Sequence, residues 1–441
     1  MAARASASIG TVTDRATTPS YRALLSVPTL GRMILGMQVA RIAQSMVSVV
    51  IVLFTLTRYG SPELAGVVVA VGTLPGILVS PIAGALLDRH GRIRLVMLDY
   101  LIAAAALVLI GALAVANLLP TGALIAIAGL SSLTLALSQT GLRSLFPILV
   151  PEHLWERANA VDSNGYVVAQ ILGPPVAAAL FSIAGGPFTM FAIAACFCVA
   201  AVAIIGVADP ITETASTGSL LRDAWQGLVY TWHNRTLRGL GFAISTINLA
   251  GGMVAIVIPI LILTRLGLGE AAVGIPFAVS GVAGMASAFY FGRLDSRGRE
   301  WLMLVLPMIG MVGGLALLLP VGIGSGSGGP SIDPVLGFGL VAASMLVTGF
   351  LNGPLDIALF TVRQRRTDPA ILGRAFAVSM AFNFLGYPVG AAIAGALADR
   401  SLVVAILFGV VACAAAALFA AILIPRSDDS VKRVENRAAG Q

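Results

Sequence analysis

Long uninterrupted runs of apolar residues, separated by short polar segments, fill most of this chain of 441 residues. Each run reaches about 20 residues, the length that an α-helix needs to cross the hydrocarbon core of a bilayer. The apolar residues are continuous rather than alternating, which favours helices over a transmembrane β-barrel. We predict twelve membrane-spanning helices, over residues 31–57, 63–87, 93–116, 121–146, 158–184, 187–207, 238–264, 270–292, 301–321, 334–361, 371–397 and 401–425.

The polar stretches divide the chain into five predicted parts. They are a tail over 1–30, a six-helix bundle over 31–207, a linker over 208–237, a second six-helix bundle over 238–425 and a tail over 426–441. The first tail is polar and lacks the apolar core of a signal peptide. In the linker, leucines and tryptophans recur at helical spacing within SLLRDAWQGLVYTWHNRTLRGL, which predicts an amphipathic helix on the membrane surface.

Composition supports the same fold class, an all-α integral membrane protein. The chain is 58% hydrophobic and 11% charged, against roughly 45–50% and about 25% in soluble domains. The net charge of +7 is spread in small clusters between the apolar runs, so we expect no nucleic-acid partner. With the N-terminus in the cytoplasm, only Arg58, Arg265 and Arg400 fall outside and Arg41 lies within a helix. This asymmetry predicts a multi-pass protein of the plasma (inner) membrane with both termini cytoplasmic.

Motifs for cofactors, metals or catalysis are missing from the sequence. The cysteines Cys196, Cys198 and Cys413 lie inside apolar runs, which suits packing rather than disulfides or metal binding. There is no Walker loop, HExxH or GxSxG motif, and the glycine-rich stretch GIGSGSGGPSIDP follows no strand. We therefore expect no cofactor, no metal and no enzymatic activity, and we expect a monomer.

Two loops of the first half recur in the second half with similar charged and glycine residues. Asp88-Arg-His-Gly-Arg92 is echoed by Asp295-Ser-Arg-Gly-Arg299, 207 residues later. The segment around Arg157, before the fifth predicted helix, is echoed around Arg374, before the eleventh. Two halves of six helices with matching loops are typical of transporters that rock around a central site.

The first of these loops resembles a known signature. Gly84-Ala-Leu-Leu-Asp88-Arg89-His-Gly91-Arg92, between the second and third helices, resembles the loop Gly-x-Leu-x-Asp-Arg-x-Gly-Arg of the major facilitator superfamily. The resemblance covers residues about 30–425 and implies two pseudo-symmetric six-helix bundles that transport solutes by alternating access. The echo is one residue shorter after Gly292 and has Ser296 in place of the arginine.

Three further stretches resemble the drug-efflux branch of that superfamily. They are LRSLFPILVPEHLWERANA, the linker helix, and Gly173-Pro174 in the fifth helix. Gly173-Pro174 resembles the antiporter signature, whose other glycines fall on small residues here, namely Ala160, Ala169, Ala177 and Ala178.

The resemblance implies a gating role for the loops. Asp88 would face the start of the eleventh helix, just after Arg374, and Asp295 would face the start of the fifth, near Arg157. Helix N-termini stabilise a nearby anion by about 0.3–1 kcal/mol at exposed sites. A tight turn predicts a positive φ at Gly91. Alternatively the charges only set topology and solubilise the loop. The full set of gating candidates is Gly84, Asp88, Arg89, Gly91, Arg92, Arg157, Asp295, Gly298, Arg299 and Arg374.

Arg41 is the deepest charge in the predicted membrane region. Gln38 and Gln44 flank it at i−3 and i+3, so the three side chains form a polar stripe that would face the central cavity. An arginine keeps its charge, so Arg41 suits an anionic substrate or a carboxylate partner rather than a proton. The alternative is that Arg41 reaches out to the interface and plays no part in transport.

Asp99, Asp162 and Asp356 lie within predicted helices and are the candidate proton carriers. Asn352 accompanies Asp356 in a polar patch, and Tyr166 and Gln170 share a helix face with Asp162. Alternatively Asp99 and Asp162 form structural ion pairs with Arg143 or Arg157. Three more polar side chains could line the cavity or bond between helices, namely Gln139, Asn248 and Asn383.

The sequence therefore predicts a secondary transporter that exports small amphipathic or hydrophobic compounds in exchange for protons. Its partners would be the small-molecule substrate, protons and the lipid bilayer. One alternative is an importer of a small anionic metabolite or siderophore-like solute, with Arg41 as the anion site. Another is a lipid-handling or sensor membrane protein that does not transport.

Overall fold

The computed structural model describes residues 21–209, 220–293, 298–323, 332–368 and 372–426. Within these ranges the ordered elements are helices, and twelve helical segments are long and apolar enough to span a membrane. The predicted number of spanning helices is confirmed. The segments are Leu30–Tyr59, Pro62–Ser80, Arg92–Val115, Thr121–Leu145, Arg157–Ala184, Gly186–Ile204, Arg235–Arg265, Glu270–Phe291, Glu300–Ile323, Pro334–Arg365, Val378–Arg400 and Leu402–Leu423.

The first half of the chain forms six of these segments. Its helices are α1 (Tyr21–Leu25), α2 (Leu30–Tyr59), α3 (Pro62–Val71), α4 (Leu74–His90), α5 (Arg92–Val115), α6 (Thr121–Ser132), α7 (Leu135–Gly141), α8 (Phe146–Leu149), α9 (Trp155–Ala184) and α10 (Gly186–Ile204).

The second half supplies the other six. Its helices are α11 (Leu220–His233), α12 (Arg235–Ile260), α13 (Gly274–Phe291), α14 (Glu300–Ala316), α15 (Leu319–Ile323), α16 (Pro334–Arg365), α17 (Leu372–Arg400) and α18 (Leu402–Leu423). A π-helical turn, Leu261–Arg265, extends α12.

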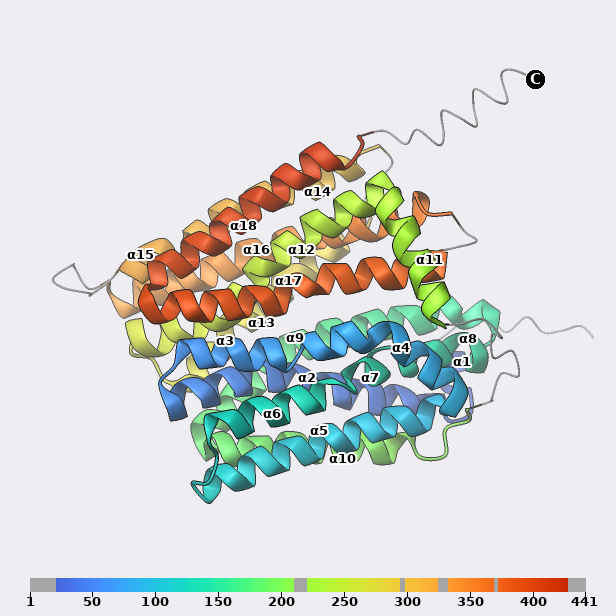
Figure 1. Ribbon diagram of the computed structural model, residues 1–441, viewed down its shortest axis with the longest axis horizontal. Coiled ribbons are helices and arrows are strands. Elements are labelled where there is room, and N and C mark those ends of the chain that lie inside the picture. Colours follow the sequence, from blue (N-terminus) through green and yellow to red (C-terminus); the bar gives the residue numbers. More distant parts are fainter. Residues whose placement is uncertain (1–20, 210–219, 294–297, 324–331, 369–371, 427–441) are drawn as a thin grey trace, which may run out of the picture.

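Figure 1 shows the two halves side by side, with the blue-to-green helices of the first half below the yellow-green-to-red helices of the second. The linker helix α11 lies across one end of the bundle and contacts α17, α12 and α4. Its aromatic side chains Trp225 and Trp232 are exposed. The predicted linker helix is therefore present, although it begins and ends inside the predicted range.

Three helices that we predicted as continuous are broken. Residues 63–87 divide between α3 and α4, where the Thr73 hydroxyl bonds to the carbonyl of Val69 (2.7 Å) and Pro75 opens α4. Residues 121–146 divide after Ser132, and residues 301–321 divide before Pro320. Proline has no N–H, and hydroxyl side chains compete for backbone carbonyls, so both interrupt a helix within an apolar run.

The helix predicted over 334–361 is longer in the structure, where α16 continues to Arg365. Arg363, which follows the end of the predicted helix and so was expected in a polar loop, is therefore inside the helix and fully buried. Its guanidinium donates to the sulfur of Met380 (2.8 Å) in α17 and, with the amide of Asn383 turned over, to that side-chain oxygen (2.6 Å). The expectation for Arg363 was wrong because four further residues join the helix.

Polar residues at the segment boundaries start the spanning helices. The Asn234 side chain caps α12, accepting from the backbone N–H of Thr236 (3.0 Å) and Leu237 (3.1 Å). Asp333 caps α16 in the same way, and Ser61 caps α3. Such caps satisfy N–H groups that have no partner inside the helix.

Small residues let the helices approach closely. A Cβ added at Gly386 or Gly390 of α17 would collide with the backbone of Ser245 or Leu249 in α12, and one added at Gly252 would collide with Tyr387. Close backbone contact is the main source of helix association in a membrane, where burial of apolar surface gives little driving force between helices.

The internal repeat is visible in the backbone. Gly60 and Gly267 have φ values of 62° and 63°, and Gly91 and Gly298 have values of 90° and 74°. The members of each pair lie 207 residues apart, the same offset as the repeated loops. We call the end of the bundle with Gly91 and Gly298 the basic end, and the end with Gly60 and Gly267 the opposite end.

The two halves meet at the opposite end. A Cβ added at Gly66 of α3 would collide with the backbone of Ala391 and Gly395 of α17. One added at Gly274 of α13 would collide with Pro175 of α9. Nearby, a cavity of about 380 Å³ separates the outer ends of α2 and α12, lined on one side by Leu56 and Thr57 and on the other by Leu263 and Thr264.

Candidate functional site

Arg41 crosses from α2 to α9 within the first half. One terminal nitrogen forms an ion pair with the Asp162 carboxylate, and the other donates to the backbone carbonyl of Asp162 (2.9 Å). The Arg41 side chain is only 12% exposed, so its charge is held inside the bundle. This geometry argues against the alternative that Arg41 extends to the interface.

A second arginine shares the same carboxylate. The Nε of Arg143 lies 2.7 Å from Oδ2 of Asp162, and the Arg143 side chain is 51% exposed. The alternative pairing of Asp162 with Arg143 is therefore present in the structure. Asp162 itself is only 3% exposed and has both carboxylate oxygens engaged by guanidinium groups.

Tyr166 lies one turn beyond Asp162 on α9, and its ring makes cation–π contacts with both guanidinium groups. The Cζ of Arg41 is 3.8 Å from the centre of the Tyr166 ring, and that of Arg143 is 5.3 Å from it. The Tyr166 hydroxyl donates to Oε1 of Gln139 (3.5 Å). A cation over an aromatic face is stabilised by about 0.5–2 kcal/mol, so the ring helps to retain the charged cluster.

Further bonds hold α2 against α9. Gln38 donates to the carbonyl of Gly165 (3.0 Å), and Ser45 donates to Oε1 of Gln170 (3.2 Å). A Cβ added at Gly173 would meet the Oγ of Ser45 at 2.6 Å, so the glycine of the fifth-helix motif permits this approach. Gln38 thus bonds to backbone, whereas Arg41 and Gln44 line the cavity.

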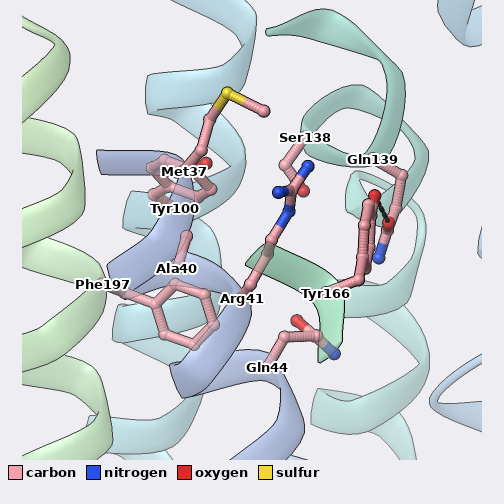
Figure 2. A pocket seen from close by; sticks show the side chains of 9 residues that line it. All are labelled: Met37, Ala40, Arg41, Gln44, Tyr100, Ser138, Gln139, Tyr166 and Phe197. Carbon is pink, nitrogen blue, oxygen red and sulfur yellow. Dashed lines mark hydrogen bonds between the residues drawn. The ribbon is translucent and has the colours of Figure 1, made fainter. Parts of the chain in front are cut away.

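The cluster borders a small cavity of about 30 Å³. Figure 2 shows Arg41 reaching from α2 toward Ser138, with Tyr166 and Gln139 on one side and apolar residues on the other. Those apolar residues are Met37, Tyr100 and Phe197. By the same measure one water molecule needs about 10–15 Å³, so the cavity itself has room for only a few water molecules and a substrate must extend out of it.

Asp99 is buried separately, at 4% exposure, on α5. The hydroxyls of Ser138 and Thr134 lie beside its carboxyl group. Among the described residues, no arginine lies within ion-pair distance of Asp99. The predicted alternative of an arginine partner for Asp99 therefore does not match this structure.

The second half presents its own polar patch. Asn352 donates to Oδ2 of Asp356 (2.8 Å), one turn later on α16. Both residues share a helix face with Met345 and Leu359, which are buried. Asn352 is exposed. Asn248, by contrast, donates to the backbone carbonyl of Asn383 (2.8 Å) and ties α12 to α17.

The signature loop is a tight turn between α4 and α5, as predicted. Gly91 has a φ of 90°, which confirms the expected positive value. The Asp209 carboxylate accepts from the backbone N–H of Ile93 (2.9 Å) and lies 4.0 Å from Arg92. An anion at this helix N-terminus is stabilised by the helix dipole. Nothing in our sequence reasoning singled out Asp209.

The structure describes only some of the residues that we predicted to take part in gating. The helices α4 and α17 are in contact, which is compatible with the predicted position of Asp88 facing the start of the eleventh helix. Arg89 and Arg299 are exposed, and Arg157 is partly buried. Asp295 lies outside the described residues, and the surroundings of Gly84, Asp88 and Arg374 are not described. Asp88 as a gating residue thus stays a prediction.

Most of the cavity wall was not anticipated. Met37 precedes Arg41 by one turn on the same face of α2, so the helical spacing around Arg41 could have identified it. Tyr100, Ser138 and Phe197 come from three other helices and carry no signal of their own in the sequence. In the described part of the chain, no cluster of His, Cys, Asp and Glu could hold a metal ion.

Comparison with known proteins identifies a family. The model of the Major Facilitator Superfamily matches residues 33–345 and 240–440. An uncharacterized MFS-type transporter, y4rN, from Sinorhizobium fredii is 34% identical, over 87% of this chain and 92% of its own. The multidrug efflux pump Tap of Mycolicibacterium fortuitum is 24% identical, over 78% and 83%. The nucleoside transporter NupG has a similar fold, with a TM-score of 0.71 at 13% identity, over 89% of this chain and 99% of its own.

Proposed function

This chain belongs to the Major Facilitator Superfamily, and on that premise we propose that it exports small amphipathic compounds in exchange for protons. The observation that carries the proposal is the charged cluster of Arg41, Asp162 and Arg143, of which Arg41 lines a cavity with an apolar wall. The basic end faces the cytoplasm, in accord with the distribution of arginines along the chain.

The two walls of the cavity suit an amphipathic substrate. Met37, Tyr100 and Phe197 offer apolar surface, and Arg41, Gln139 and Tyr166 offer a few polar groups. A sugar would need many more hydrogen-bonding groups than this wall presents. The similarity to the multidrug efflux pump Tap supports export as the direction.

Alternating access requires the contacts of the opposite end to separate. In the described residues, the halves touch at Gly66, at Gly274 and where α4 meets α17, and the polar side chains of Gln139, Arg143 and Asn352 are exposed. An exporter takes up its substrate in a state that is open toward the cytoplasm. Release requires the reverse arrangement.

Asp99 is our candidate for the coupling proton, in preference to Asp162. Protonating Asp162 would leave two guanidinium groups without a counterion inside the membrane, which is costly. Asp99 has hydroxyl neighbours, and a neutral carboxylic acid can donate to them without an uncompensated charge. A proton can therefore enter and leave Asp99 while the Arg41–Asp162 pair stays intact.

The experiment is dye accumulation in an efflux-deficient bacterium that expresses the chain. Three probes cover the charge types: anionic carboxyfluorescein, cationic ethidium and neutral N-phenyl-1-naphthylamine. We expect at least one dye to accumulate less than in cells with empty vector, and a protonophore to abolish the difference. Equal accumulation of all three dyes, with the protein confirmed in the membrane, would contradict export of amphipathic compounds.

A second candidate is import of a small anionic solute. Its supporting observation is the excess positive charge of the cluster, since two arginines share one carboxylate. Proteoliposomes with a proton gradient of either sign distinguish the two directions. Uptake that follows protons inward would favour import, and exchange against protons would favour export.

A further inference from the structure

The Arg41–Asp162–Arg143 cluster has unequal numbers of positive and negative groups. Two guanidinium groups carry two positive charges, and the Asp162 carboxylate carries one negative charge. Other described carboxylates do not balance it, because Asp99 lies beside hydroxyls and Asp356 is bonded to Asn352 on the other half. The rim of the cavity is therefore cationic.

The excess charge is presented on Arg143. Its Nε faces Asp162, and in the described part of the chain its two terminal amino groups have no hydrogen-bond partner. The side chain is 51% exposed, against 12% for Arg41. Arg143 thus offers a pair of parallel N–H donors at an exposed position, an arrangement that matches an oxyanion with two acceptor atoms.

Neighbouring side chains fix the position of these donors. Asp162 holds the Nε end of the guanidinium, and the Tyr166 ring lies 5.3 Å from its Cζ. A group held at two points loses less freedom when it binds a ligand. The apolar wall of Met37, Tyr100 and Phe197 lies across the cavity from Tyr166, on the other side of Arg41.

We infer that the substrate is an amphipathic organic acid, whose carboxylate or sulfonate binds the terminal nitrogens of Arg143 while its apolar part lies along the aromatic wall. This inference rests on the proposed export function and specifies its substrate. A cationic amphiphile would meet the positive rim with no carboxylate available, because both oxygens of Asp162 are already engaged.

The test compares carboxyfluorescein, loaded as its diacetate ester, with ethidium in the same cells. We expect the wild type to export carboxyfluorescein and to discriminate against ethidium. Arg143→Gln should lower carboxyfluorescein export by about tenfold or more, because it removes a charge-assisted pair of hydrogen bonds. Arg143→Lys should retain part of the rate. The matched control is Arg235→Gln, which removes an exposed arginine at the start of α12 and should leave export unchanged.

The outcomes separate this inference from the proposed function. Export of ethidium or the neutral dye with retention of carboxyfluorescein would overturn the acid inference and leave export standing. Export of carboxyfluorescein by Arg143→Gln at the wild-type rate would overturn it too. If the wild type exports no dye, both proposals fail. If Arg143→Gln does not reach the membrane, the preference of the wild type for carboxyfluorescein over ethidium still tests whether the substrate is an acid.

Discussion

Replacing Asp162 by asparagine tests whether the charged cluster is a structural unit. The substitution keeps the shape of the side chain and removes the charge that Arg41 and Arg143 share. Arg143, at 51% exposure, can turn toward water, so its loss of a partner contributes little. Arg41, at 12% exposure, cannot, so it remains as an uncompensated charge inside the bundle.

The expected magnitude follows from that difference. Breaking a buried ion pair by removing one partner costs about 3–5 kcal/mol. At roughly 2–4 °C per kcal/mol for a unit of 150–250 residues, the thermal midpoint in detergent should fall by about 6–20 °C. The double variant Arg41→Gln with Asp162→Asn should regain much of this loss, because neither charge is then left unpaired.

The Glu300–Arg365 ion pair provides the control. Its arginine is 46% exposed and its glutamate 11% exposed, and it lies at the basic end of the second half. Glu300→Gln should therefore change stability by no more than about 1 kcal/mol. A thermal midpoint for Asp162→Asn equal to that of Glu300→Gln would refute the reasoning, and so would a double variant that is less stable than either single one.

Three further predictions concern the proton, the opposite end and the aromatic ring. Asp99→Asn should abolish protonophore-sensitive export while substrate exchange without a gradient persists; loss of both activities would contradict a specific proton role. Thr264→Cys, in a chain without native cysteines, reports access to the cavity at the opposite end through its labelling by an impermeant maleimide. Gly66→Leu should raise this labelling rate, because the added side chain disrupts the contact between α3 and α17. Gly122→Leu, with open space around it, should not. Tyr166→Leu should slow export by about tenfold through loss of a cation–π contact of roughly 1–2 kcal/mol, whereas Tyr166→Phe keeps the ring and should stay near the wild-type rate.

The number of spanning helices could be predicted because bilayer thickness fixes their length, and the apolar runs record that length directly. The breaks at Thr73 and Ser132 could not. A single hydroxyl residue within an apolar run is compatible with an unbroken helix, and whether it bonds to a backbone carbonyl depends on the neighbouring helix. The Ser132 hydroxyl, for example, contacts the carbonyl of Val71 (3.2 Å) on α3.

The charged members of the site could be predicted one by one, but their arrangement could not. Arg41 and Asp162 each stood out as an ionisable residue in a membrane segment. They lie 121 residues apart in the sequence, so only the packing of α2 on α9 shows that they are partners. Asp209 gave no signal, because its role depends on the end of α10 lying beside the signature loop.

The repeat also indicates how the two halves differ in function. The offset of 207 residues places Asn248 at the position of Arg41, and the offset of 217 residues between Arg157 and Arg374 places Ser379 at that of Asp162. Asn248 still donates from the first helix of its half to the backbone of the fifth, as Arg41 does. The helix contact is thus kept while the ion pair is absent from these positions. If the fold alone required charge there, both halves would carry it. We therefore propose that the pair in the first half serves transport, and substitution of Asn248 by a neutral residue of similar size should leave substrate preference unchanged.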